Sequence, residues 1–358
     1  MAEKLAKQIV MANLLHSRII VVGLKSSCKN KQHYTNFAEI FTILDFLPPS
    51  LPKGKRYHSF AAHIKACYGG RLQKVVIDAG FSCPNRDGTL GTEGCTYCLN
   101  AAFHPAYSHP SVSLHQQIDE GILFHQQRYT RAQGYLAYFQ SYSNTYAPLE
   151  RLKQVYTEAL DHPKINGLVI GTRPDCVDAQ TLDYIAELAS KHIIFIEYGI
   201  ESCYNRTLQR IERGHTFEQA QEAVIQSARR GLQTGAHFIF GLPDETKNDM
   251  MRTADLIGSL PLTSVKFHQL QIIKGSRMEQ DYLQHPNDFT TFDLPEYIDF
   301  FVDYLEMFNP NIAIERFAGE VPPRFVNHTP WGLVRNVDLI RMLEKRLEER
   351  DTWQGRKR

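Results

Sequence analysis

Residues 74–98 read KVVIDAGFSCPNRDGTLGTEGCTYC, and this stretch decides the fold class and the chemistry that we expect. Residues 74–78 have an apolar, β-branched centre and predict a buried strand. The loop that follows contains Cys83, Cys95 and Cys98, with eleven residues between the first two and two between the last two. Four glycines in the same loop allow the backbone to fold closely around a compact object. We therefore expect a site at the end of this strand.

Strands and helices alternate beyond this loop. The clearest helix is 216–230, because Thr216 is placed to cap it and Gly231 follows its end. Six strand–helix repeats predict an α/β fold with a parallel sheet, namely a partial (β/α)6 barrel of the TIM type. The predicted strands are 74–78, 135–140, 167–171, 193–199, 236–240 and 264–273, and the predicted helices are 113–129, 148–160, 179–190, 216–230 and 248–258.

Composition divides the chain into three parts. Residues 1–52 form an N-terminal extension that ends in a proline-rich linker, and its composition leaves open whether it is partly disordered. Residues 53–275 form the barrel core. Residues 276–358 form a C-terminal extension that closes the barrel, with a helix at 295–308, a strand at 312–315 and a helix at 337–350.

The overall composition allows a large folded domain. With 43% hydrophobic residues among 358, the chain can bury a sizeable core. The formal net charge of +1 neither requires nor excludes a polyanionic partner, because a basic patch can be local. No run of 18 apolar residues occurs, and the N-terminus lacks a signal-peptide core, so we predict no membrane span and a cytoplasmic location.

The three clustered cysteines allow more than one kind of metal site. A structural zinc site usually takes four ligands, commonly as two pairs, whereas this loop offers one pair and one single. His104 is the nearest candidate for a fourth ligand. A [4Fe–4S] cluster with three thiolates leaves one iron open to a substrate, and we favour this interpretation over zinc and over coincidental core cysteines.

The other cysteines are scattered. Cys28 lies in the N-terminal extension and Cys67 on a predicted helix, and both are interpreted as small buried hydrophobes. Cys176 follows a strand end, which makes it a candidate reactive thiol near the substrate. No second clustered set exists in the sequence, so no auxiliary cluster is expected.

At this point the sequence resembles the radical S-adenosylmethionine (SAM) superfamily, and within it the bacterial proteins related to the Elongator catalytic subunit. The resemblance covers roughly residues 55–335. Its motifs are CPNRDGT from residue 83 with GCTYC ending at residue 98, GTRPDC at 171–176, RGH at 213–215 and GLP at 241–243. The long spacing between Cys83 and Cys95 departs from the commoner superfamily pattern and is similar to that of Elongator-like members.

The resemblance implies a [4Fe–4S] cluster and SAM as cofactors. The open iron would bind the amino and carboxylate groups of SAM, and one electron would cleave SAM to a 5′-deoxyadenosyl radical. The protein would supply positioning and electrostatics. An electron donor of the flavodoxin or ferredoxin type is implied as a partner.

The resemblance also assigns residue roles by matching motifs. Arg213 matches the arginine that pairs with the SAM carboxylate, which a guanidinium fork suits. Glu201 lies where relatives contact SAM, and His237 matches a position that faces the ribose. The remaining candidates are Gln140 and Ser141 near the methionine amine, Glu197 on the fourth strand, and Gly241 beside the adenine.

Two departures from the family pattern matter. Related enzymes commonly carry Glu where this chain has Gly171, and Glu197 is the candidate to supply that contact. The chain also lacks the acetyltransferase half of the Elongator subunit, so it cannot carry out that protein's full reaction.

The resemblance leaves the substrate open but favours tRNA or another RNA. Tyr138, Tyr142 and Tyr146 are candidates to stack on an exposed base, and residues 341–350 and 356–358 are candidates to contact phosphates. Packing is the favoured role of these tyrosines, and a solvated, mixed-charge helix face explains the basic residues at least as well. A small metabolite remains the alternative substrate, and a zinc-stabilised binding module remains the non-enzymatic alternative.

Overall fold

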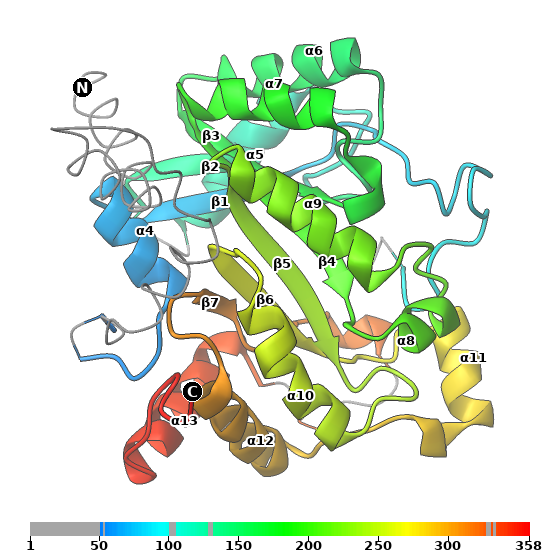
Figure 1. Ribbon diagram of the computed structural model, residues 1–358. Coiled ribbons are helices and arrows are strands. Elements are labelled where there is room, and N and C mark those ends of the chain that lie inside the picture. Colours follow the sequence, from blue (N-terminus) through cyan, green and yellow to red (C-terminus); the bar gives the residue numbers. More distant parts are fainter. Residues whose placement is uncertain (1–50, 53, 100–104, 128–131, 327–330, 332–333) are drawn as a thin grey trace, which may run out of the picture.

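A computed structural model of the chain describes residues 51–52, 54–99, 105–127, 132–326, 331 and 334–358. Seven parallel strands form one sheet that curls into a half-barrel, and their order in space follows their order in the sequence (Figure 1). The α/β prediction is confirmed. The strands are β1 (Leu72–Ile77), β2 (Gly134–Phe139), β3 (Ile165–Thr172), β4 (Ile193–Glu201), β5 (Gln233–Phe240), β6 (Ser264–Gln269) and β7 (Ala313–Arg316).

Most helices lie on the outer face of the half-barrel (Figure 1). The longer ones are α4 (Phe60–Tyr68), α5 (Leu114–Gln126), α6 (Leu149–Leu160), α7 (Ala179–Ala189), α9 (Phe217–Arg229), α10 (Lys247–Gly258), α12 (Leu294–Met307) and α13 (Asn336–Glu349). Shorter ones are α8 (Asn205–Arg210), α11 (Arg277–Gln284), and the 3₁₀ turns η2 (Pro174–Cys176), η3 (Pro286–Asp288) and η4 (Pro323–Phe325). No helix among the described residues is both long and apolar enough to cross a membrane.

Strand alternation divides the core between the two faces of the sheet. In β2, Ala137 and Phe139 join the large apolar cluster, which also contains side chains of the outer helices, while Leu136 and Tyr138 face inward. The inner side chains pack against α4, which contributes Phe60 and others. Because this inner cluster includes residues at the starts of β4 and β7, it fills the amino end of the half-barrel. Space for chemistry is therefore left at the carboxyl ends.

The capped helix predicted at 216–230 is α9. The Thr216 hydroxyl accepts from the Gln219 backbone N–H at 3.3 Å, and the Gln219 side chain accepts from the Thr216 N–H at 2.8 Å. This reciprocal capping box satisfies two otherwise unpaired donors at the helix start. Gly231 follows with φ of 74°, a left-handed conformation that favours glycine.

Two strands differ from the prediction. The short strand expected at 312–315 in the C-terminal extension is β7, which joins the same sheet beside β6. The strand expected to reach residue 273 ends at Gln269. Beyond that point Ile273 forms an isolated antiparallel bridge with Val326, so the chain leaves the sheet.

The C-terminal basic residues are engaged by acidic side chains. Arg346 lies 2.6 Å from Asp299, Arg350 lies 2.5 Å from Asp303, and Lys357 pairs with Glu306. These pairs favour the interpretation of α13 as a solvated, mixed-charge face. The N-terminal extension to residue 50, Cys28 and His104 lie outside the described residues, and the proposed division at residues 53 and 275 stays a prediction.

Candidate active site

A cavity of about 290 Å³ lies at the carboxyl ends of the strands. Eight predicted site residues line it, namely Cys83, Cys95, Cys98, Gln140, Glu197, Glu201, Arg213 and His237. Ser141, Cys176 and Gly241 are not among its lining residues. Sequence reasoning missed Arg173, Lys266, His268 and Arg316, which also line it. A charged residue between two apolar neighbours, Val265 and Phe267, was the signal available for Lys266.

The cysteine loop is folded back on itself by backbone and amide contacts. The Leu90 N–H donates to Pro84 O at 2.7 Å, and the Gly94 N–H donates to Asn85 O at 2.8 Å. The Asn85 amide donates to Glu212 O at 2.7 Å and approaches Cys95 Sγ at 3.3 Å. Asn85 thus ties the loop to the segment that carries Arg213.

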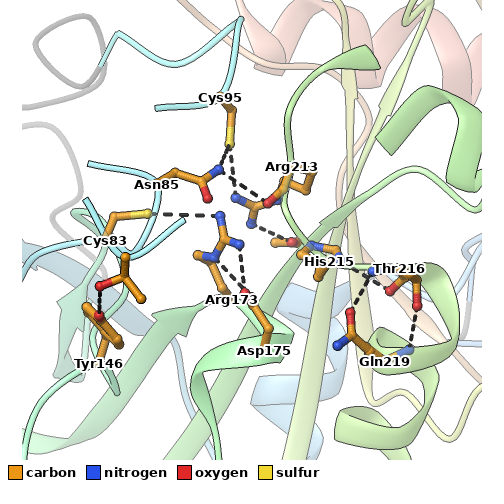
Figure 2. A network of polar contacts seen from close by, with 12 residues as sticks. Cys83, Asn85, Cys95, Tyr146, Arg173, Asp175, Arg213, His215, Thr216 and Gln219 are labelled. Atoms are coloured by element: carbon orange, nitrogen blue, oxygen red, sulfur yellow. Dashed lines mark hydrogen bonds and ion pairs between the residues drawn. The ribbon is translucent and has the colours of Figure 1, made fainter. Parts of the chain in front are cut away.

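Each loop cysteine has an arginine beside it. Arg173 Nη1 lies 4.0 Å from Cys83 Sγ, and Arg213 Nη1 lies 3.5 Å from Cys95 Sγ. Figure 2 shows both guanidinium groups in the space between these two cysteines. Arg86 donates to the Cys98 carbonyl at 2.9 Å. Three fixed positive charges therefore surround the three thiols.

Arg173 is held by a bidentate ion pair. Its side chain is almost fully buried, and Nε and Nη2 donate to the two Asp175 carboxylate oxygens at 2.9 and 2.7 Å (Figure 2). Planar guanidinium–carboxylate pairs of this kind fix orientation as well as charge. Both residues belong to the GTRPDC motif at 171–176, so the sequence already contained the two members of this ion pair.

Arg213 is positioned by the end of β4. Its Nη2 donates to Gly199 O at 2.6 Å and lies 3.7 Å from Glu201 Oε1. A Cβ on Gly199 would lie 2.7 Å from that Nη2 and 2.6 Å from Glu201 Oε1, so an alanine there would force the ends of both side chains to shift. Glu201 itself has φ of 75°, a strained conformation for a non-glycine residue.

Glu197 is the centre of a buried ion network. Its oxygens accept from Lys74 at 2.6 Å, Lys266 at 2.6 Å and His237 at 3.1 Å. Burial would raise the pKa of Glu197, but Lys266, Lys74 and His237 outweigh it and hold that pKa well below its usual value. Both carboxylate oxygens are thus engaged within the protein. At position 171, where related enzymes carry Glu, a Cβ would lie 2.9 Å from the backbone oxygen of Phe139. The backbone of β2 therefore leaves no room for a glutamate at that position.

The three remaining predicted residues do not line this cavity. Burial raises the pKa of the half-buried Cys176 thiol to about 12, and its carbonyl accepts from Thr145 at 2.6 Å. Ser141 is buried. Gly241 has φ of 91° and borders a smaller neighbouring cavity.

A larger cavity of about 480 Å³ adjoins the first. The two share Gln269, Leu270, Gln271, Gly319, Glu320 and Val321 as lining residues. Gly319 accepts from the side chains of Gln269 at 3.3 Å and Gln271 at 3.4 Å, which holds the shared wall in place. The site therefore consists of two adjoining spaces, of which one is lined by the cysteines.

Comparisons with known proteins identify the family. A family model described as the radical SAM superfamily matches residues 88–257, and one described as the Radical_SAM C-terminal domain matches residues 262–349. The uncharacterized protein YtqA of Bacillus subtilis is 32% identical over 302 residues, which are 84% of this chain and 92% of YtqA. The chain belongs to the radical SAM superfamily. The resemblance found in the sequence is thereby confirmed, and the chain is a radical SAM enzyme.

Two further relatives support this placement. Protein YhcC of Escherichia coli K12 is 36% identical over 225 residues, which are 63% of this chain and 71% of YhcC. An archaeal Elp3 structure, from Methanocaldococcus infernus with residues 1–46 deleted, matches with a TM-score of 0.59 at 15% identity. That match covers 79% of this chain and 64% of the Elp3 chain, and at this identity it reports the fold alone.

The residues present fit the cofactors that the radical SAM family implies. The described residues hold no group of three or more His, Cys, Asp or Glu side chains that converge on a single ion. A [4Fe–4S] cluster distributes its thiolates over several irons, so its ligands need only face one space, as these three do. The buried Nε of Arg213 also has no acceptor among the described residues. Family membership favours iron–sulfur over the zinc-stabilised binding module.

Proposed function

We propose that Cys83, Cys95 and Cys98 bind a [4Fe–4S] cluster, that SAM binds beside it, and that the enzyme modifies a base of tRNA. The observation that carries the cofactor part is the single cavity on which all three thiols open, with an arginine beside each. When bound, the cluster would deliver the electron that cleaves SAM reductively.

The protein side chains would hold SAM by charge and hydrogen bonding. Arg213, already oriented by Gly199 O, has a free Nε for the SAM carboxylate. Glu201 and Gln140 line the same cavity and offer acceptors to the methionine amine, and His237 faces it from β5. Glu197 would act indirectly, by holding His237 at 3.1 Å.

The tRNA part rests on the Elongator-like motifs and on the shape of the site. A flipped base needs a recess beside the reacting atoms, and the adjoining cavity of about 480 Å³ offers one. Tyr142, which is 37% exposed and lies beneath the Arg86 guanidinium, is available for stacking at the rim. Tyr138 is not, because it is buried and its hydroxyl accepts from Lys266 at 3.2 Å.

Radical SAM enzymes generally need a reductant. We propose a flavodoxin- or ferredoxin-type donor in the cytoplasm, where a reducing environment preserves thiolate ligands.

The test is anaerobic reconstitution followed by turnover. Protein with iron and sulfide should take up about four irons and release 5′-deoxyadenosine from SAM under a strong reductant. Alanine at Cys83, Cys95 or Cys98 should abolish both, whereas Cys67→Ala, on α4, should abolish neither. Zinc uptake without iron would contradict the cofactor assignment.

The substrate is tested with tRNA from a strain that lacks the protein. That tRNA should gain or lose a nucleoside only when enzyme, SAM and reductant are all present. If a metabolite is consumed instead while tRNA stays unchanged, the small-molecule alternative replaces the tRNA proposal.

A further inference from the structure

Arg316 is the last residue of β7 and lines the cavity that contains the cysteines. The strand register places Gly199, His237, Lys266 and Arg316 side by side across β4 to β7. Arg316 therefore lies at the carboxyl end of the sheet, where parallel α/β folds place their ligands.

Arg316 differs from the other charged side chains of this cavity in having no partner. In the part of the chain that the structure describes, its guanidinium makes no hydrogen bond and no ion pair. The other charged side chains of the wall are engaged: Arg173 by Asp175, Arg213 by Glu201 and Gly199 O, Arg86 by Cys98 O, Lys266 by Glu197, and Glu320 by the Asn336 N–H.

An unpaired arginine in this position is electrostatically unsatisfied. A guanidinium cannot lose its proton at physiological pH, and it is half-buried here. Its neighbour His268 offers no compensation, because burial and then the charge of Arg316 lower the His268 pKa well below its usual value. The carboxylates of Glu197 on β4 and Glu315 on β7 already share Lys74 and Lys266.

Arg316 lies two strands along the register from His237, and Arg213 comes from the segment that follows β4. The segment that follows Arg316 contains Gly319 and Glu320, which line both cavities. A ligand that enters through the larger cavity would therefore meet Arg316 without displacing Arg213.

We propose that Arg316 binds an anionic group, a carboxylate or a phosphate, of the molecule that this enzyme modifies. The inference rests on the proposed function, because it takes the cavity as the radical SAM active site. Arginine suits either group, since its planar fork donates two parallel hydrogen bonds to a pair of oxygens.

The test compares Arg316→Gln and Arg316→Lys with Arg252→Gln, an exposed arginine on α10 that serves as the single-charge control. The probes are unfractionated tRNA from a strain lacking the protein, the dephosphorylated nucleosides of that tRNA, and a small-molecule extract of the same strain. Retention is measured by ultrafiltration and mass spectrometry with SAM present, and SAM affinity by equilibrium dialysis.

Arg316→Gln should leave SAM affinity unchanged and weaken retention of an acidic species roughly 10- to 150-fold, the scale of hydrogen bonds to a charged group. Arg316→Lys should recover part of this retention, because the positive charge remains while the planar guanidinium is lost. If Arg316→Gln loses retention of a free nucleoside, the bound group is an acidic group on the base. If it loses retention of intact tRNA only, the bound group is a phosphate.

Other outcomes separate this inference from the tRNA proposal. If wild-type protein retains no tRNA but retains an acidic metabolite through Arg316, the tRNA proposal fails and the inference stands. Three results would overturn the assignment of Arg316 as the anion-binding residue. The wild-type protein could retain only neutral or cationic species, Arg316→Gln could retain acidic species as well as wild type does, or that variant could lose SAM affinity.

Discussion

Replacing Glu197 with glutamine tests the buried ion network at its centre. Glu197 is 2% exposed, and its charge compensates Lys266, whose side chain is 6% exposed, at 2.6 Å. After the change, Lys74 keeps Glu315 at 2.6 Å, but Lys266 keeps only a carboxylate at 3.4 Å. Removing one partner of a buried pair costs about 3–5 kcal/mol. Because Glu315 remains, we expect the lower end, about 3 kcal/mol of unfolding free energy.

The assay is denaturant unfolding of the anaerobic apo-protein, followed by circular dichroism. Glu197→Gln should lower the denaturation midpoint, while Glu150→Gln, which removes an exposed pair on α6, should not. Adding Lys266→Met to Glu197→Gln should recover part of the loss, because the uncompensated cation is then gone.

The pH dependence provides a second check. The folded pKa of Glu197 lies below the unfolded value of 4.5, so its stabilisation is present above about pH 4.5 and is lost as the pH falls toward the folded pKa. Glu197→Gln should remove this contribution and flatten the acid limb of the stability profile. A midpoint equal to that of Glu150→Gln, with an unchanged acid limb, would refute the reasoning.

Three other predictions follow from single contacts. Arg213→Ala should weaken SAM binding by roughly 1.5–3 kcal/mol, measured by equilibrium dialysis, and unchanged affinity would mean that another group holds the carboxylate. Gly199→Ala should also reduce SAM affinity, because its Cβ would displace Arg213 and Glu201; an affinity equal to wild type would contradict this. Thr216→Ala should cost about 1 kcal/mol of unfolding free energy through loss of the capping box, whereas Thr216→Ser should retain most of it.

Much of the architecture was predictable because its signals are local. The capping box of α9 lies within four consecutive residues, and the buried strands are short apolar runs. The end of β6 was not predictable from its own residues, because Leu270 to Ile273 are as strand-like as the residues before them. Contacts with Gly319 and Val326, some 50 residues away, end the strand there.

The same distinction between local signals and long-range contacts applies to the functional site. The sequence by itself determined the cysteine set, the superfamily and the strand–helix order, because these depend on spacing along the chain. Only the tertiary structure decided that Glu197 is shared by Lys74 and Lys266, that Cys176 lies off the cavity wall, and that Arg316 lies on it unpaired. The physical reason is strand register: it brings together charges that are tens to hundreds of residues apart, and a lone charge in a strand carries no record of its partner.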